Sequence, residues 1–555
     1  MPIWPASNRL IRASLAIAMT ALAAPAQEQE APKPEEPMLW RLRAIEIERG
    51  NVFKQGEVEV NLISRLANSL HWTTDEAVVR REVWLRPGQL VDAEDAAEVA
   101  RRLRGSGWFQ SVETELIPVG DDTADLMVRT RDRFTLTAYG NVSQVGGVTR
   151  VEAEVAERNI FGSGKSVQAR YSTDDTITST SVAYEDRQFL DSWHTLSAVA
   201  GVTNSGEFGA LGIARPFKHL RDPWSYGASV RGVASSVYYY QRGNIAAEIP
   251  QQNESLRMFV ANASGPREMR TVLGMDLTAA SNDRDPTTGV AASSFPAPAS
   301  ADYVELGGSW SWNWTPRYEE VTRIDTLSYT QDLPLGLITS ARLALRYRDA
   351  VGQSPQLQPV VSVGVRASSE VVEDVWVTAH AGASGRWADG DNVAHLLTGT
   401  LHGFWRTDFL AQTFCGSATF TEAEEDQDLP VQFTLGEDNG LRGYPAREFA
   451  GQRVVRLNFE DRIDTGVEIW AFRLGLAAFT DIGFIDDPFQ GLTLRDPLRS
   501  YGAGLRIGSK RLFGPGILRV DLAWPLDEVD GVDFGPSVSV TFGQVFTFFG
   551  NSNFL

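Results

Sequence analysis

The sequence predicts a transmembrane β-barrel of antiparallel strands, preceded by one small α+β domain. Three observations carry this prediction. The chain begins with a segment typical of exported proteins, and most of the remainder alternates apolar and polar residues with a period of two. In addition, no later segment offers the roughly 20 uninterrupted apolar residues that a membrane-spanning helix needs. An exported chain of this kind is either soluble or crosses a membrane with strands.

The first 26 residues have the parts of a secretory signal peptide. Arg9 and Arg12 supply a short basic region, the stretch from Ala13 to Ala26 is mostly apolar, and its last three residues fit the small-x-small cleavage rule. We therefore expect a signal peptide over residues 1–26. Residues 27–39 are charged and rich in proline, which is typical of a linker.

Residues 40–133 have the pattern of a small α+β domain. Alternation around Leu42 predicts a first strand. A helix is expected after Asp92, which can cap its N-terminus, and before Gly105, which can end it. An earlier short helix and two closing strands complete an expected order of β-α-α-β-β.

Residues 134–555 repeat strand-like segments of about ten residues between clusters of Gly, Asn, Asp and Pro. In VVRLNFEDRI, Val455, Leu457 and Phe459 share one face, whereas Glu460 and other polar residues share the opposite face. A barrel with lipid outside and water inside requires this division. We expect sixteen strands, each taking about 26 residues with its loop, although the plausible segments somewhat exceed sixteen.

A soluble β-sandwich or propeller would show the same period of two. The membrane barrel is favoured because one face is continuously apolar while the other carries full charges. Aromatic residues also gather at the ends of expected strands, where they could form interfacial girdles. These residues are Trp310, Trp312, Trp314, Trp387 and Trp405.

The composition argues against several classes of protein. Lys and Arg total 51 and Asp and Glu total 71, which gives a formal net charge of −20. Nucleic acid is not an expected partner, because its affinity comes from neutralising phosphates with basic residues. The lone cysteine, Cys415, rules out an intramolecular disulfide and any zinc site built on paired cysteines. The six histidines show no ligand spacing, so neither a metal nor a cofactor is expected.

Motifs of enzymes are missing from the sequence. It contains no Gly-x-Ser-x-Gly nucleophile elbow, no phosphate-binding loop and no His-Glu-x-x-His pair. We therefore expect that the chain is not an enzyme.

One segment interrupts the strand pattern near the C-terminus. FTLGEDNGLRGYPAREFAG, from Phe433 to Gly451, places Arg442 in a glycine-rich loop. This loop resembles the loop signature of the BamA/TamA superfamily, the bacterial surface antigen family. The stretches from Ala156 to Ser172 and from Phe479 to Ile485 are also similar to segments of that family. Residues 40–133 resemble one POTRA domain, and members of the family join such domains to a sixteen-stranded outer-membrane barrel.

The resemblance implies that the loop folds back into the barrel and that its arginine meets acidic residues of the inner wall. The sequence supports this mapping, because Asp481 and Glu460 both fall on the charged faces of their strands. Our hypothesis is that Arg442 pins the loop through Asp481, with Glu460 as a second partner. An exposed arginine in a turn is the alternative. The loop residues expected to accompany this arrangement are Gly436, Gly440, Gly443 and Tyr444.

The resemblance also implies a protein of the cell outer membrane that inserts or translocates other proteins, with its POTRA domain in the periplasm. Its partners would be unfolded outer-membrane or secreted protein clients, outer-membrane lipid, and periplasmic or lipoprotein accessory factors. A single POTRA domain is fewer than assembly factors and two-partner secretion pores usually carry, which puts client handling in doubt. The alternatives are a passive channel or two-partner-type secretion pore, and a structural or lipid-handling envelope protein.

Overall fold

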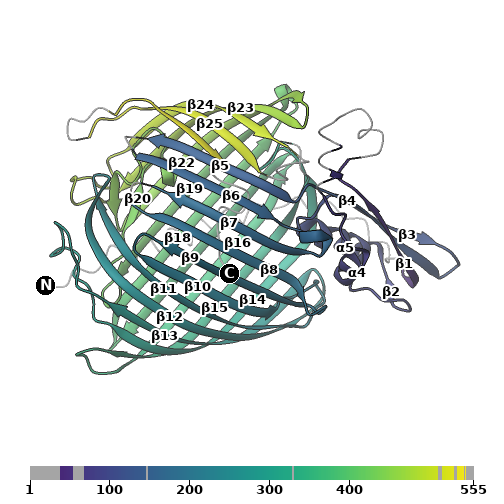
Figure 1. Cartoon of the computed structure of the whole chain (residues 1–555), viewed down its shortest axis with the longest axis horizontal. Helices are drawn as coiled ribbons and strands as arrows, with labels where there is room; N and C mark the ends of the chain where they lie inside the picture. Colours follow the sequence, from purple (N-terminus) through teal and green to yellow (C-terminus); the bar gives the residue numbers. More distant parts are fainter. Residues whose placement is uncertain are drawn as a thin grey trace.

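The computed structural model places an α+β unit at one end of a large β-barrel (Figure 1). The expected signal peptide and nearly all of the expected linker lie outside the residues that the structure describes. The described residues are 38–53, 65, 68–69, 71–145, 148–174, 176–327, 330–509, 516–529, 534–542 and 544.

In the described residues, the α+β unit is a four-stranded sheet with the helices α4 and α5. Its strands lie in the order β2-β1-β4-β3, with β1 parallel to β4 and β3 at an edge. Helix α5 begins after Asp92, whose side chain accepts a hydrogen bond from the backbone of Asp95 in a capping box. No helix of the described residues is both long and apolar enough to cross a membrane. The elements are β1 (Trp40–Gly50), α4 (Glu76–Glu82), β2 (Leu90–Val91), α5 (Ala93–Gly105), β3 (Phe109–Pro118) and β4 (Thr123–Asp132).

The barrel closes with twenty strands among the described residues, so the expectation of sixteen is wrong. The bounds are β5 (Leu136–Val145), β6 (Val148–Glu157), β7 (Lys165–Thr173), β8 (Thr178–Phe189), β9 (His194–Thr203), β10 (Gly206–Arg215), β11 (Trp224–Gln241), β12 (Asn244–Ser264), β13 (Met269–Arg284), β14 (Ala301–Val321), β15 (Gln331–Ala350), β16 (Gln356–Val372), β17 (Val375–Ala388), β18 (Asp391–Arg406), β19 (Gln412–Glu425), β22 (Arg453–Ile469), β23 (Phe472–Ile485), β24 (Leu498–Gly508), β25 (Ile517–Pro525) and β26 (Ser537–Phe542). The short helical turns η1 (Ile160–Gly162) and η2 (Phe409–Ala411) lie between strands.

Tight hairpins explain the larger number of strands. Two residues each join β11 to β12, β16 to β17, β17 to β18 and β22 to β23. These turns place Arg242, Asp374, Asp389 and Trp470 at φ values of 51°, 61°, 52° and 58°. Positive φ belongs to the turns whose twist matches the twist of the flanking strands. Connections this short leave room for more strands than the sequence estimate allowed.

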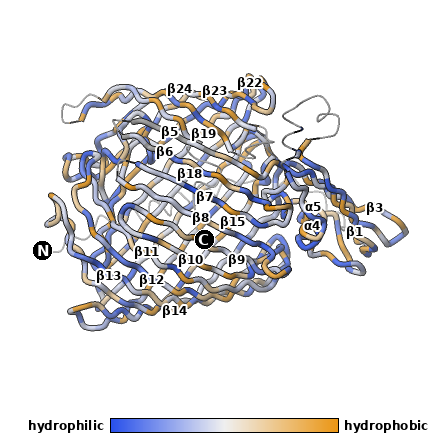
Figure 2. The backbone as a smooth tube through the Cα atoms, in the orientation of Figure 1, coloured by the Kyte–Doolittle hydropathy of each residue, from blue (hydrophilic) through white to orange (hydrophobic). Residues whose placement is uncertain are grey.

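The outer face of the wall is apolar, and the tube of Figure 2 shows the alternation along the strands. Leu256 on β12 lies beside Val230 on β11, and Val304 on β14 lies beside Ala279 on β13; the side chains of Leu256, Val230 and Val304 are 39%, 48% and 48% exposed. A belt of exposed aliphatic side chains around a closed barrel is stable in lipid and not in water. The chain is therefore a transmembrane β-barrel.

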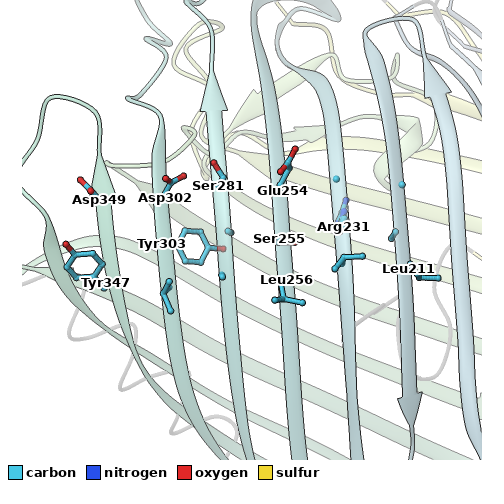
Figure 3. A pocket seen from close by; sticks show the side chains of 17 residues that line it. Leu211, Arg231, Glu254, Ser255, Leu256, Ser281, Asp302, Tyr303, Tyr347 and Asp349 are labelled. Carbon is cyan, nitrogen blue, oxygen red and sulfur yellow. The ribbon is translucent and has the colours of Figure 1, made fainter.

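A row of polar side chains marks one border of this belt (Figure 3). Glu254, Ser281, Asp302 and Asp349 are successive register partners across β12, β13, β14 and β15. They line a shallow hollow of about 970 Å³. Leu256, Val304 and Tyr347, which lie two positions away on the same strands, line it as well. Charges are tolerated at the edge of the hydrocarbon layer and not at its centre.

The α+β unit contacts several turns at its end of the barrel. The Gln188 side chain at the end of β8 donates to the Val78 carbonyl at 3.0 Å, and Arg267 after β12 donates to Asp95 at 2.7 Å. Arg104 of α5 reaches the ends of β14 and β15. The unit is thus bound to the rim from β8 to β15.

Candidate functional site

The loop between β19 and β22, residues 426–452, folds into the barrel. Two short strands within it, β20 (Phe433–Leu435) and β21 (Phe449–Gly451), pair with each other, and η3 (Glu437–Asn439) lies between them. Apolar side chains of the loop, including Leu441 and Phe449, are buried with Ile485 of the wall in one cluster. Burial of these side chains draws the loop against β22, β23 and β24, because apolar area is removed from water there.

Arg442 lies at the centre of this loop and is bound on every side. Its Nε and Nη2 donate to the two carboxylate oxygens of Asp481 at 2.7 and 2.8 Å, and Nη1 donates to Glu460 at 2.9 Å. Its backbone N–H donates to Asp481 at 3.2 Å. The guanidinium carbon also lies 3.4 Å from the ring centre of Phe479. A bidentate pair with a cation–π contact fixes both the position and the plane of the guanidinium.

The three side chains are sealed from water. The Arg442 side chain is 3% exposed, and those of Glu460 and Asp481 are fully buried. Asn458 donates to Asp481 at 2.7 Å and to the Gly440 carbonyl at 2.6 Å, so the same carboxylate is tied to the loop twice. Such a buried pair tolerates no loss of one partner, because the other charge would remain in a medium of low polarity.

Further arginines extend the network along the inner wall. Arg462 and Arg506 both donate to the second oxygen of Glu460, at 2.9 and 3.1 Å. Arg506 also donates to Asp521 at 2.5 Å, and this carboxylate lies 3.6 Å from Arg442. Carboxylates and guanidinium groups therefore alternate across β22, β24 and β25 behind the loop.

The structure brings together all residues that the sequence placed at this site. Gly440 and Gly443 have φ values of 88° and 95°, which side chains with a Cβ rarely adopt. Gly436 is needed for close approach, because a Cβ there would lie 2.1 Å from the Pro445 carbonyl oxygen. Tyr444 is buried and donates from its hydroxyl to the Arg499 carbonyl at 2.9 Å.

Sequence reasoning missed a second contact of the loop, formed by Asp428. This carboxylate accepts from Arg386 at 2.7 Å and from Arg284 at 3.3 Å, and it lies 3.8 Å from Arg346. These arginines belong to β17, β13 and β15, on a different part of the wall from Asp481. Arg348 supports the contact by donating to the Gln427 carbonyl at 3.0 Å.

A third contact, also missed, is made by Arg447. Its Nη1 donates to the Tyr240 hydroxyl at 2.9 Å, its Nη2 pairs with Asp174, and the guanidinium carbon lies 4.7 Å from the Tyr240 ring centre. Arg447 has a φ of 59°, which is uncommon for a residue with a Cβ. The loop is thus bound to three parts of the wall and spans the lumen.

The side chains of the site bind one another. Within the described parts of the chain, no group of three or more potential ligands could hold a metal ion. Four hydrogen bonds and an aromatic face already surround Arg442. What the arrangement can do is hold a loop inside a barrel.

Comparisons with solved structures return bacterial outer-membrane proteins. The chain is similar to CdiB from Escherichia coli, with a TM-score of 0.42 and 11% identity over 98% of this chain and 99% of that chain. It is also similar to BamA from Haemophilus ducreyi lacking POTRA domains 1-3, with a TM-score of 0.40 and 12% identity over 91% and 84%. CdiB from Acinetobacter baumannii is similar with a TM-score of 0.39 and 11% identity over 91% of this chain and 74% of that chain. No family model and no curated protein matches the chain.

Proposed function

We propose that this chain is an outer-membrane protein of the BamA/TamA type that inserts or translocates client polypeptides. The observation that carries the proposal is the Arg442 site, in which the loop signature quoted from the sequence lies inside a closed barrel against Asp481 and Glu460. In this proposal the α+β unit is a POTRA domain on the periplasmic side. Its clients are unfolded outer-membrane or secreted proteins.

The sheet of the α+β unit offers a place for a client. Strand β3 lies at the edge of the order β2-β1-β4-β3, so one of its sides has no strand partner in the described sheet. An extended peptide can add to such an edge by backbone hydrogen bonds. The short closing strands β5 and β26, where Gln144 lies opposite Val538, are the proposed place at which a client strand would enter the wall. Folding of the client would supply the free energy.

The proposal is tested with the full chain in liposomes and an unfolded outer-membrane barrel as client. Folding of the client is followed by its heat-resistant gel mobility, beside empty liposomes and liposomes with an unrelated porin. We expect faster folding only with this chain. No acceleration, together with steady ion conductance, would favour a passive channel and contradict insertion.

Crosslinking tests the role of the β3 edge in the same assay. A photoreactive residue replaces Glu113, which is exposed on β3, and a matched control replaces Glu76, which is exposed on α4. We expect the client to crosslink at position 113 and not at position 76. Equal yields at the two positions would contradict capture by strand addition.

A further inference from the structure

A cavity lies between the α+β unit and the barrel wall, beside the turn that joins β12 to β13. Its volume is about 750 Å³, which is within the range of pockets that hold small ligands. Met38, Trp40 and the first turn of α5 line it from the unit. Arg267, Glu268 and residues 315–318 line it from the barrel. The cavity therefore exists only where the two parts meet.

The cavity lies at the border of the lipid-facing belt. Met269 and Trp314 are register partners on β13 and β14, and each is 43% exposed on the outer face. Glu268 and Arg317 come directly beyond this pair, and the Glu268 carbonyl accepts from the Thr315 N–H at 2.7 Å. Three residues of a tilted strand rise about 7 Å along the membrane normal, and the head-group region is about 5–8 Å thick. The cavity is therefore at the depth of lipid head groups.

The α+β unit exposes apolar side chains beside the cavity. Met38 and Leu39 are 69% and 53% exposed, and they directly precede Trp40. Adjacent exposed apolar side chains mark a surface that contacts lipid or a partner. Met and Trp at this depth gain from contact with the border of a bilayer, where Trp is enriched.

Two arginines of the barrel have donors left for an anion in the cavity. The Arg317 side chain is 56% exposed and, among the described contacts, uses only Nη2, which lies 2.6 Å from Glu370 and 3.4 Å from Glu319. The Arg267 side chain is 9% exposed and donates only through Nη2, and its Nε is buried without a partner among the described residues. An anionic oxygen in the cavity would complete the hydrogen bonds of these groups.

Two carboxylates that line the same cavity have oxygens left for a cation. Glu268 is exposed and has no ion pair among the described contacts. Glu94 of α5 is 46% exposed and pairs through one oxygen with Arg101, whose guanidinium carbon lies 4.4 Å from the ring centre of Tyr318. A simple anion would be repelled by the carboxylates, and a simple cation by the arginines. A zwitterion can pair with both.

We propose that the cavity binds one phospholipid whose head group carries a primary ammonium. The phosphate lies between Arg267 and Arg317, because guanidinium groups hold phosphate oxygens by parallel hydrogen bonds. The ammonium donates to Glu94 and Glu268, which a choline head group without an N–H cannot do. The acyl chains continue along the lipid-facing wall. The lipid thereby joins the α+β unit to the barrel at the surface of the membrane.

Native mass spectrometry of the full chain in detergent tests this site. The chain is mixed with equal amounts of phosphatidylethanolamine, phosphatidylcholine and phosphatidylglycerol that carry the same acyl chains. We expect one retained phosphatidylethanolamine per chain and about tenfold less of the other two lipids. Equal retention of the three would overturn the proposal. The measurement needs no client, so its outcome is independent of the proposed insertion.

Variants separate the two halves of the head group. Arg317→Ala should lower the retention of phosphatidylethanolamine by about fivefold, and Arg317→Lys should be intermediate because it keeps the charge without the fork. Glu268→Gln should remove most of the preference over phosphatidylcholine while the retention of phosphatidylcholine stays unchanged. An equal fall of both lipids in Glu268→Gln would contradict recognition of the ammonium. The matched control is Arg129→Ala, an exposed arginine of the unit whose partners are Glu48 and Glu115, and it should change nothing.

Crosslinking in liposomes tests where the lipid binds. A phosphatidylethanolamine with a photoreactive group high in one acyl chain should label residues 38–40 and 267–269 of the wild type, and Arg317→Ala should reduce this labelling. Excess soluble glycerophosphoethanolamine should not compete, because it lacks the acyl chains that the belt binds. Displacement by the soluble compound, or labelling spread evenly around the belt, would overturn the assignment of a membrane lipid to this cavity. Heat-resistant gel mobility verifies that each barrel is folded.

Discussion

The loop of residues 426–452 is held against two parts of the barrel wall by opposite chemistry. At β22 and β23 a loop arginine, Arg442, lies among carboxylates of the wall and is 3% exposed. At β13 to β17 a loop carboxylate, Asp428, lies among arginines of the wall and is 24% exposed. We call the first contact dry because all its side chains are buried. We call the second wet because the carboxylate of Asp428 is partly exposed, although Arg386 and Arg284 beside it are only 8% and 4% exposed.

This difference in exposure to water matters more for stability than the number of ion pairs at each contact. A dry pair has no solvent to replace a lost partner, so its removal strands a charge. A wet pair can exchange its partner for water or salt ions. We therefore expect the Arg442 contact to decide whether the barrel is stable. The Asp428 contact should contribute less to that stability and should mainly decide how firmly one end of the loop is held.

The largest effect is expected for Arg442→Ala. The change leaves Asp481 and Glu460 buried without their cation and should lower the free energy of unfolding by about 3–5 kcal/mol. Urea unfolding in lipid vesicles, followed by tryptophan fluorescence, measures the loss. Arg442→Lys should recover only part of it, because an ammonium cannot form the bidentate pair with Asp481. Equal unfolding midpoints for Arg442→Ala and the wild type would show that the buried pair does not stabilise the barrel.

A smaller effect is expected for Asp428→Ala. The loss should be about 1–2 kcal/mol, the range for a hydrogen bond to a charged group, and it should shrink at about 1 M salt because solvent ions screen the partly exposed pair. The same unfolding experiment at two salt concentrations measures it, with Arg442→Ala as the salt-insensitive reference. A loss as large as that of Arg442→Ala, unchanged by salt, would break the distinction between the two contacts.

The Arg447 contact should be weaker again. Arg447→Ala removes a partly exposed ion pair with Asp174 and a cation–π contact with Tyr240, together worth about 1 kcal/mol. We expect faster thermolysin cleavage within residues 426–452 and a smaller change in the unfolding midpoint than Asp428→Ala causes. Arg447→Lys keeps the charge and should cleave at an intermediate rate. A shift of the midpoint as large as that of Arg442→Ala would mean that the Arg447 contact stabilises the barrel as the buried contact does.

The two contacts also differ in how far the sequence predicted them. The period of two put Glu460 and Asp481 on the charged faces of their strands, and the loop signature put Arg442 nearby. Asp428 and Arg447 carry no such signal, because their partners lie far away in the sequence: Arg284 and Asp174 are 144 and 273 positions distant. Only the closure of the barrel brings those strands to the loop.

The number of strands was missed for a local reason. The estimate of sixteen assumed long connections, whereas hairpins such as the one at Asp374 turn within two residues at positive φ. Asp389-Gly390 is a recognised turn signal, but Asp374 and Trp470 occupy their turns without a following glycine. The POTRA assignment of the α+β unit stays a prediction.

The last prediction concerns the protonation of Glu448, a loop carboxylate next to Arg447. Glu448 follows Arg447, and its burial, together with nearby Asp487, raises its pKa to about 7 against the attraction of Arg242. The carboxyl group of Glu448 therefore holds its proton more tightly in the folded protein than in the unfolded chain, where its pKa is near 4.5. The stabilising contribution is complete below about pH 4.5 and is lost as the pH rises through about 7. Thermolysin cleavage of the loop should quicken between about pH 5 and pH 8 in the wild type, and Glu448→Gln should remove that slope. If the slope persists in Glu448→Gln, another group of the loop titrates in this pH range, and Glu448 is not the cause of the pH dependence.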